Sequence, residues 1–224
     1  MQRNRDTDTR EQSISVQQYS SIPFLFEVIF ALICFKLKKM EVKGTAIKTT
    51  RDFIKTKFPE QYDAWFNALP AGSRTLYETA LDATGWYPLN DSYTVPIRKV
   101  VEMFYNNDAK TGGEDLGKYS AEIALKGFYK VFLLVASPTF LIQRASKIFT
   151  TFYQPSKIEV EVVHSNAAIL KILEFDGIDS ALEYRIAGWV LKALELANCR
   201  EPAYDIKSSL AKGDPETDIL FNWK

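Results

Sequence analysis

A change in hydrophobic period near residue 155 constrains the fold more than any other feature of this chain. Before it, apolar residues recur at the three- and four-residue spacing of amphipathic helices, and after it apolar and polar residues alternate in short segments typical of strands. One long helical pattern divides these segments into two pairs. We therefore expect an α+β fold, with an N-terminal helical layer packed on a small four-stranded antiparallel β-sheet in the order β-β-α-β-β.

The C-terminal part contains the clearer patterns. Alternation predicts strands over residues 158–164, 169–175, 204–210 and 219–223. Helical spacing predicts one long helix over 180–198. Ser180 and Glu183 have the spacing of a capping box, in which two side chains satisfy free N–H groups of the first helical turn. We expect this helix to cover one face of the sheet.

The preceding part is predicted to be helical from residue 44 to about residue 154. Apolar spacing, prolines and glycines divide it into helices over about 45–58, 59–69, 73–83, 96–105, 114–136 and 138–152. The helix over 114–136 is apolar almost all round at its end, which is typical of a central, buried helix. Residues 85–89 (GWYPL) are predicted to be a break whose aromatic side chains form a hydrophobic plug, because a proline disfavours helix in the residue before it.

Residues 1–39 have a different character from the rest. Residues 1–21 are polar without a period and are expected to be disordered, and residues 22–35 form an apolar run interrupted by a proline and a glutamate. The run is shorter than the roughly 20 apolar residues of a spanning helix. Three interpretations remain open: translation from Met40, so that 1–39 is not part of the native product; membrane contact through 22–39, the less favoured one; or a packed helix. Residues 40–224 are expected to form a single α+β domain.

Composition and cysteine usage exclude several classes of protein. The net charge is zero, which argues against nucleic acid as the partner. Cys34 and Cys199 are the two cysteines; they are far apart and have the spacing of neither a disulfide framework nor a zinc site, which favours a cytoplasmic location. No glycine-rich phosphate-binding motif occurs.

The residues that usually announce catalysis are missing or isolated. His164 is the only histidine and lies in a predicted strand, without a recognisable nucleophile or second metal ligand near it. Cys199 has no general base close in sequence, so packing is its expected role. We therefore predict no catalytic residue, no metal site and no enzymatic activity.

The chain also resembles a known family over about residues 40–224. The resemblance rests on the order of five segments: VKGTAIK, GWYPL, KYSAEIALKGFYKVFLLVASPTFLIQRASKIFTTFY, AGWVLKALELA and KGDPETDILFNW. Together they resemble an uncharacterised family of similar length found in myxobacteria. By layout, that family is similar to the ligand-binding superfamily of NO signalling and Golgi transport, which includes haem-NO-binding, 4-vinyl-reductase-type and Bet3-like domains. The resemblance implies an α+β fold with a pocket between helices and sheet.

Two features of the haem-binding members have no counterpart in this sequence. Those members have a proximal histidine on a helix and a Tyr-x-Ser-x-Arg clamp for the propionates, whereas His164 lies in a predicted strand and no such clamp occurs. We therefore expect no cofactor, and haem in particular is not expected.

Two functions from different classes follow. The first is a non-catalytic ligand-binding or sensory domain that holds a small apolar molecule between helices and sheet. Its pocket is expected to be lined by Phe128, Phe132, Phe140, Phe149 and Trp189, although the same aromatics could fill the space completely.

The alternative is a protein–protein interaction or adaptor module, dimeric and without a small-molecule ligand. It would use a helical face with the basic stripe Lys48, Arg51 and Lys55, which could equally be an ordinary solvated face. The partner would then be a second copy of this chain or another protein.

Overall fold

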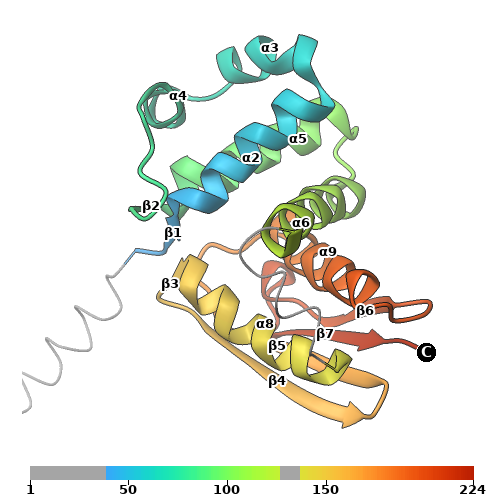
Figure 1. Ribbon diagram of the computed structural model, residues 1–224. Helices are drawn as coiled ribbons and strands as arrows, with labels where there is room; N and C mark the ends of the chain where they lie inside the picture. Colours follow the sequence, from blue (N-terminus) through green and yellow to red (C-terminus); the bar gives the residue numbers. More distant parts are fainter. Residues whose placement is uncertain (1–38, 127–136) are drawn as a thin grey trace, which may run out of the picture. The chain divides into compact units, whose positions relative to one another are not determined.

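The computed structural model describes residues 39–126 and 137–224, and Lys39–Lys224 form one compact unit (Figure 1). The predicted α+β class is confirmed. In chain order the elements are β1 (Glu41–Lys43), α2 (Gly44–Lys57), η2 (Pro59–Gln61), α3 (Tyr62–Asn67), α4 (Ala71–Glu78), β2 (Trp86–Pro88), η3 (Asn90–Thr94, a π-helical turn), α5 (Val95–Phe104), α6 (Ala109–Lys126), α8 (Pro138–Phe152), β3 (Tyr153–Gln154), β4 (Lys157–His164), β5 (Ala167–Glu174), α9 (Ser180–Leu196), β6 (Ala203–Ser208), η4 (Leu210–Lys212) and β7 (Thr217–Asn222).

The last part has the predicted β-β-α-β-β order. Its four strands form an antiparallel sheet in the order β4-β5-β7-β6. Helix α8 packs on β4 and β5, and α9 packs on β6 and β7, so one face of the sheet is covered (Figure 1). The alternation in the sequence explains this, since Ala168, Leu170 and Ile172 of β5 are buried while Lys171 points to the other face, beside Asp218. The cover does not reach the end of β4, where Val162 is 41% exposed and His164 is exposed.

A second, three-stranded sheet in the order β2-β1-β3 was not expected from the sequence. Val42 pairs with Tyr87 on one side and with Tyr153 on the other. The predicted break in the helical pattern at residues 85–89 is present, but the prediction missed that Trp86–Pro88 form a strand. The same proline effect explains the result: Pro88 pushes Tyr87 into the extended region, and extended backbone can pair with a neighbouring strand.

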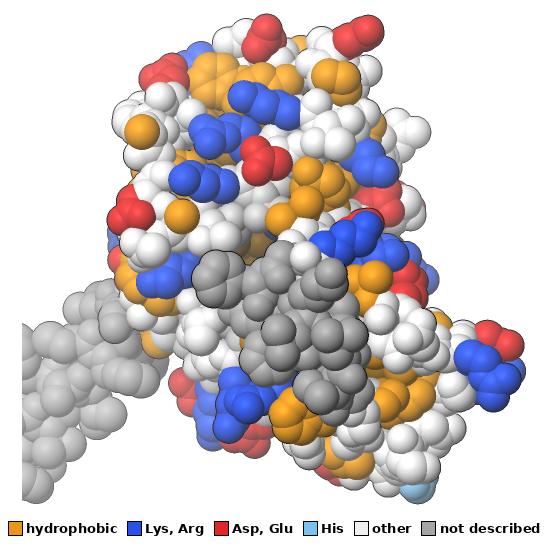
Figure 2. All heavy atoms as spheres, viewed as in Figure 1, with side chains coloured by type: hydrophobic (Ala, Val, Ile, Leu, Met, Phe, Trp, Pro, Cys, Tyr) orange, Lys and Arg blue, Asp and Glu red, His pale blue; other side chains and the backbone are white. Residues whose placement is uncertain are grey.

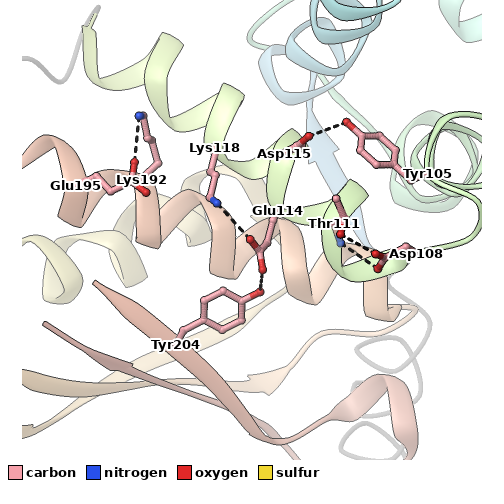
Figure 3. A network of polar contacts seen from close by, with 9 residues as sticks. All are labelled: Tyr105, Asp108, Thr111, Glu114, Asp115, Lys118, Lys192, Glu195 and Tyr204. Carbon is pink, nitrogen blue, oxygen red and sulfur yellow. Dashed lines mark hydrogen bonds and ion pairs between the residues drawn. The ribbon is translucent and has the colours of Figure 1, made fainter. Parts of the chain in front are cut away.

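Helices α6 and α9 pack unusually closely, because glycines lie where they meet. A Cβ atom on Gly117 of α6 would stand 2.1 Å from the Arg185 carbonyl oxygen of α9, and one on Gly188 of α9 would stand 2.5 Å from the Glu114 carbonyl oxygen. Polar contacts join α6 to neighbouring elements (Figure 3): the Tyr204 hydroxyl of β6 donates to Glu114, and the hydroxyl of Tyr105, the residue after α5, donates to Asp115 at 2.9 Å. This fixes α9, and the side chains on it, against the helical layer.

The start of α9 differs from the predicted capping box. Asp179 is the N-cap, and its carboxylate accepts a hydrogen bond from the Leu182 N–H at 2.9 Å. Glu183 does not turn back to the cap; it is 1% exposed and accepts hydrogen bonds from Ser209, Ala211 and Thr217. An aspartate one residue earlier satisfies the first turn, which frees the glutamate to bind the β6–β7 connection.

No helix among the described residues is long and apolar enough to cross a membrane. The predictions for residues 1–38 and for 127–136 lie outside the described part of the chain.

Candidate functional site

A small cavity lies where the helical layer meets α8 and α9. Its volume is about 40 Å³. Side chains from α2, η3, α6, α8, β3 and α9 line it, so it draws on both halves of the fold; they are Ala46, Tyr93, Ser120, Ile148, Phe149, Phe152, Tyr153, Arg185, Ile186 and Trp189. A site that is built from both halves is the arrangement expected of a ligand pocket.

The most unusual residue of the wall is Arg185, a cation that is only 3% exposed. Its Nη1 donates to the Thr50 hydroxyl of α2 at 2.8 Å, and its Nη2 donates to the Ser120 hydroxyl of α6 at 2.9 Å. The guanidinium carbon lies 4.5 Å from the centre of the Tyr93 ring, which is a cation–π distance. Arg185 thus joins α9 to three elements of the helical layer.

All of these neighbours are neutral. No carboxylate in residues 39–126 or 137–224 forms an ion pair with Arg185. A buried cation without an opposite charge is costly, which makes this residue the first candidate for a binding role.

Two buried phenols stand next to the guanidinium. The Tyr93 and Tyr153 hydroxyl oxygens are 3.1 Å apart and share one hydrogen bond. Burial raises the pKa of both phenols, even though the nearby Arg185 guanidinium works in the opposite direction. Both tyrosines therefore stay protonated and supply no negative charge.

The rest of the wall is largely apolar and aromatic. Phe149 of α8 and Trp189 of α9 are buried and meet edge to face, with ring centroids 5.3 Å apart. Of the predicted pocket residues, these two line the cavity. Phe140 does not, because it lies at the exposed start of α8 and is 41% exposed. Phe128 and Phe132 lie outside the described residues.

The predicted basic stripe lies on α2. Lys48 and Arg51 are half-buried and Lys55 is exposed, with its Nζ 4.7 Å from the centre of the Tyr62 ring. Figure 2 shows basic side chains gathered over α2, with an acidic side chain between them. These residues lie on the outer surface and line no part of the cavity.

Neither His164 nor Cys199 lines the cavity. His164 is exposed at the end of β4. Burial raises the pKa of the Cys199 thiol, so this residue has little of the thiolate character that a nucleophile needs. Within the described ranges no group of three or more His, Cys, Asp and Glu side chains could hold a metal ion.

Sequence reasoning missed Arg185, Tyr93 and Tyr153. A signal for Arg185 was present, since it falls on the stripe of α9 formed by Leu182, Ile186 and Trp189, where a charge is unexpected. The tyrosines gave no signal, because their pairing joins residues that are 60 positions apart in the chain.

Comparison with known proteins gives structural matches alone. No protein-family model matches the chain, and no curated protein matches its sequence. Among solved structures, an H-NOX protein from S. oneidensis in the Fe(II)NO state has a TM-score of 0.64 at 10% identity, covering 81% of this chain and 99% of that one. The Fe(II) unliganded A71G H-NOX protein from K. algicida has a TM-score of 0.60 at 14% identity, covering 81% and 96%.

A third structure, from work on haem redox potential and protein-induced porphyrin distortion, has a TM-score of 0.56 at 11% identity and covers 81% of this chain and 95% of that one. At these identities the likeness establishes the fold, and the predicted similarity to haem-NO-binding domains is confirmed at the level of the fold.

The prediction of no cofactor, with haem not expected, is contradicted by these neighbours, whose descriptions name Fe(II), nitric oxide and haem. The prediction required a helical histidine and one particular clamp. Other residues can take those roles, because tyrosine also ligates haem iron and arginine pairs with carboxylates in general.

The cavity fits haem poorly in its ligands and in its size. Tyr93 and Tyr153 are protonated phenols, no described histidine lines the cavity, and Arg185 alone offers a charge, for a carboxylate. A volume of about 40 Å³ is far below the roughly 300–1,000 Å³ of pockets for organic ligands. A porphyrin would therefore require the walls to move apart.

Proposed function

We propose that residues 39–224 form a non-catalytic ligand-binding or sensory domain, and that its ligand occupies the cavity at Arg185. The observation that carries this proposal is the mixed composition of the cavity wall. Phe149 and Trp189 supply aromatic surface, while Arg185 and two phenols supply polar groups that no described charge neutralises. Apolar walls with a few convergent polar groups are typical of small-molecule sites.

The residues that line the cavity favour binding over catalysis. Its hydroxyl groups belong to Ser120, Tyr93 and Tyr153, and no described histidine or carboxylate lies on the wall to act as their general base. The H-NOX neighbours are described by the gas or oxidation state of a bound centre, which supports a sensory role. We place the domain in the cytoplasm, as its cysteine usage suggests.

The ligand is a small, mainly apolar molecule, and haem is one candidate because of the structural neighbours. The test is native mass spectrometry and absorption spectroscopy of the full chain purified gently from its own host, before and after addition of haem. We expect a reproducible added mass that is lost on denaturation, or a haem spectrum at one haem per chain. A clean apo mass that haem does not change would overturn the proposal.

A matched pair of variants links any bound mass to the cavity. Ala46 of α2 lines the cavity, so Ala46→Leu should fill its space and abolish binding. Ala71 lies at the exposed start of α4, and Ala71→Leu should bind like the unmodified chain. Equal binding by both variants would move the ligand to another place.

The alternative is an adaptor module that binds a second copy of this chain or another protein through α2. One observation favours it: no described carboxylate forms an ion pair with Lys48, Arg51 or Lys55. Sedimentation of the full chain at several concentrations tests the dimer. The charge-reversed variant of all three residues should abolish association if this surface makes it, and an unchanged dimer would exclude the surface.

A further inference from the structure

We propose that the ligand of this cavity carries a carboxylate, and that the Arg185 guanidinium binds that carboxylate. This inference rests on the proposed function and names the chemical class of its ligand. It is argued from hydrogen-bond donors and charges that the described residues leave without a partner.

The first argument is the number of free donors on Arg185. A guanidinium has five N–H groups, and two of them bond to the Thr50 and Ser120 hydroxyls. Those hydroxyls give their own protons to backbone carbonyls, Thr50 to Ala46 at 3.1 Å and Ser120 to Leu116 at 2.7 Å. Each hydroxyl thus donates one bond and accepts one from Arg185, and three N–H groups of the guanidinium have no described acceptor.

The phenols add another hydrogen-bond donor without a described acceptor. Tyr93 and Tyr153 share one hydrogen bond, so one of the two protons is donated and the other has no acceptor among the described residues. Both side chains are buried, at 1% and 5% exposure, and bulk water does not reach them freely. The cavity wall thus offers free N–H and O–H donors, and no described carboxylate accepts from them.

The second argument is that no described residue supplies Arg185 with a negative charge. The described carboxylates make no ion pair with Arg185, and residues 127–136 contain neither Asp nor Glu. The phenols remain neutral because burial raises their pKa. A carboxylate would supply both the charge and the acceptors, since its two oxygens can accept parallel bonds from one guanidinium.

The size of the cavity distinguishes two sources of the carboxylate, which are a short free acid and a larger molecule that carries a carboxylate group. A cavity of about 40 Å³ has room for the carboxylate itself, whereas benzene occupies an engineered cavity of about 150 Å³. A short free acid would fit as the walls stand. A longer acid or a porphyrin propionate would place its apolar part against Phe149 and Trp189 and displace them.

The experiment compares matched probes on the full chain by isothermal titration calorimetry. The probes are decanoate and decan-1-ol, acetate, and haem against its dimethyl ester. We expect the chain to bind decanoate or haem at least tenfold more tightly than the alcohol or the ester, or to bind acetate alone. The first result assigns the carboxylate to a large molecule and the second to a small one.

Variants assign the preference to Arg185. Arg185→Met should remove it, and Arg185→Lys, which keeps the charge and loses the planar pair of donors, should retain only part of it. Arg98→Met is the control, because Arg98 is an exposed arginine that pairs with Asp179 outside the cavity. Circular dichroism verifies that each variant folds, and the lysine variant decides the matter if the methionine variant does not fold.

The two proposals fail in different ways. Equal binding of decanoate and decan-1-ol, with both lost in Ala46→Leu, would overturn the carboxylate and leave the ligand-binding domain standing. A preference for the carboxylate that survives Arg185→Met would also overturn this assignment. Absence of binding for every probe, together with a clean apo mass from the native host, would overturn both.

Discussion

Helix α9 carries two buried charges, Glu183 and Arg185, whose surroundings differ completely. They are two residues apart, so their side chains leave the helix in nearly opposite directions. Glu183 is 1% exposed and Arg185 is 3% exposed. One faces the connection between β6 and β7, and the other faces the helical layer.

The carboxylate of Glu183 is provided with donors. Ser209 donates to Oε2 at 2.7 Å, while the Ala211 N–H and the Thr217 hydroxyl donate to Oε1. Ser209 and Ala211 belong to the segment that links β6 to β7, and Thr217 begins β7, so this charge fixes the end of the sheet to α9. Arg185, in contrast, has more donors than acceptors. Glu183 therefore has the surroundings of a structural charge, whereas Arg185 has the surroundings expected of a charge that binds a ligand.

The largest expected effect is that of Glu183→Ala. It removes the acceptor of charge-assisted bonds from two buried hydroxyls and the part-buried Ala211 N–H, so it should lower the free energy of unfolding by about 3–5 kcal/mol. Urea denaturation measures this. Glu195→Ala on the same helix is the control; it removes an exposed ion pair with Lys192 and should cost less than about 1 kcal/mol. Similar losses of unfolding free energy in both variants would show that Glu183 is not a structural charge.

Gly117→Ala should have the next largest effect and should act mainly on the Arg185 side. The new Cβ would lie 2.1 Å from the Arg185 carbonyl oxygen, so α6 and α9 must separate, at a cost of about 2–3 kcal/mol. Separation draws Ser120 of α6 away from Arg185, whereas the donors to Glu183 do not belong to α6. Denaturation and carboxylate titration measure the two consequences.

The control for this substitution is Gly72→Ala in α4. A Cβ there would meet nothing closer than 4.0 Å, so the better helix propensity of alanine should raise stability by up to about 1 kcal/mol. If Gly117→Ala also stabilised the chain, the close packing of α6 on α9 would be in error.

A matched pair of threonines compares the two sites directly. Thr217 and Thr50 are both fully buried. Thr217→Val removes a donor to Glu183 and the acceptor of the Leu210 N–H, and should cost about 2 kcal/mol. Thr50→Val removes one acceptor of Arg185, whose guanidinium borders a cavity where water can replace it, and should cost about 1 kcal/mol. The reverse order in urea denaturation would make the Arg185 side the structural one.

Sequence patterns predicted the larger architecture because it depends on local periodicity. The four strands, α9 and most helices follow from which residues alternate and which recur at helical spacing. The β2-β1-β3 sheet was not predicted, because its strands have only two or three residues. Its pairing also joins Val42 to residues far away in the chain, Tyr87 and Tyr153. Such short strands have no period to detect.

Only the aromatic residues of the candidate site were predicted from the sequence. Phe149 and Trp189 belong to patterns that mark a core, and a core residue that also borders a cavity has the same pattern. The charge of Arg185 was visible in the sequence, but its value as a signal depends on the absence of a carboxylate nearby. That absence is a property of the three-dimensional neighbourhood, since Glu183 is two positions away in the chain and bonds on the other side of the helix.

The smallest expected effect on stability is that of Arg185→Met, and its size decides whether Arg185 differs in role from Glu183. If Arg185 were a structural residue like Glu183, its removal would cost several kcal/mol. A buried charge without an opposite partner gives little net stability, and methionine can occupy the space with its flexible side chain. We therefore expect the free energy of unfolding of the ligand-free chain, measured in urea, to change by less than about 1 kcal/mol in either direction.

Added carboxylate should stabilise the unmodified chain and leave this variant unchanged, because a ligand stabilises only the form that binds it. A loss of 3 kcal/mol or more without ligand would make Arg185 a second structural charge and remove the basis for a binding site there.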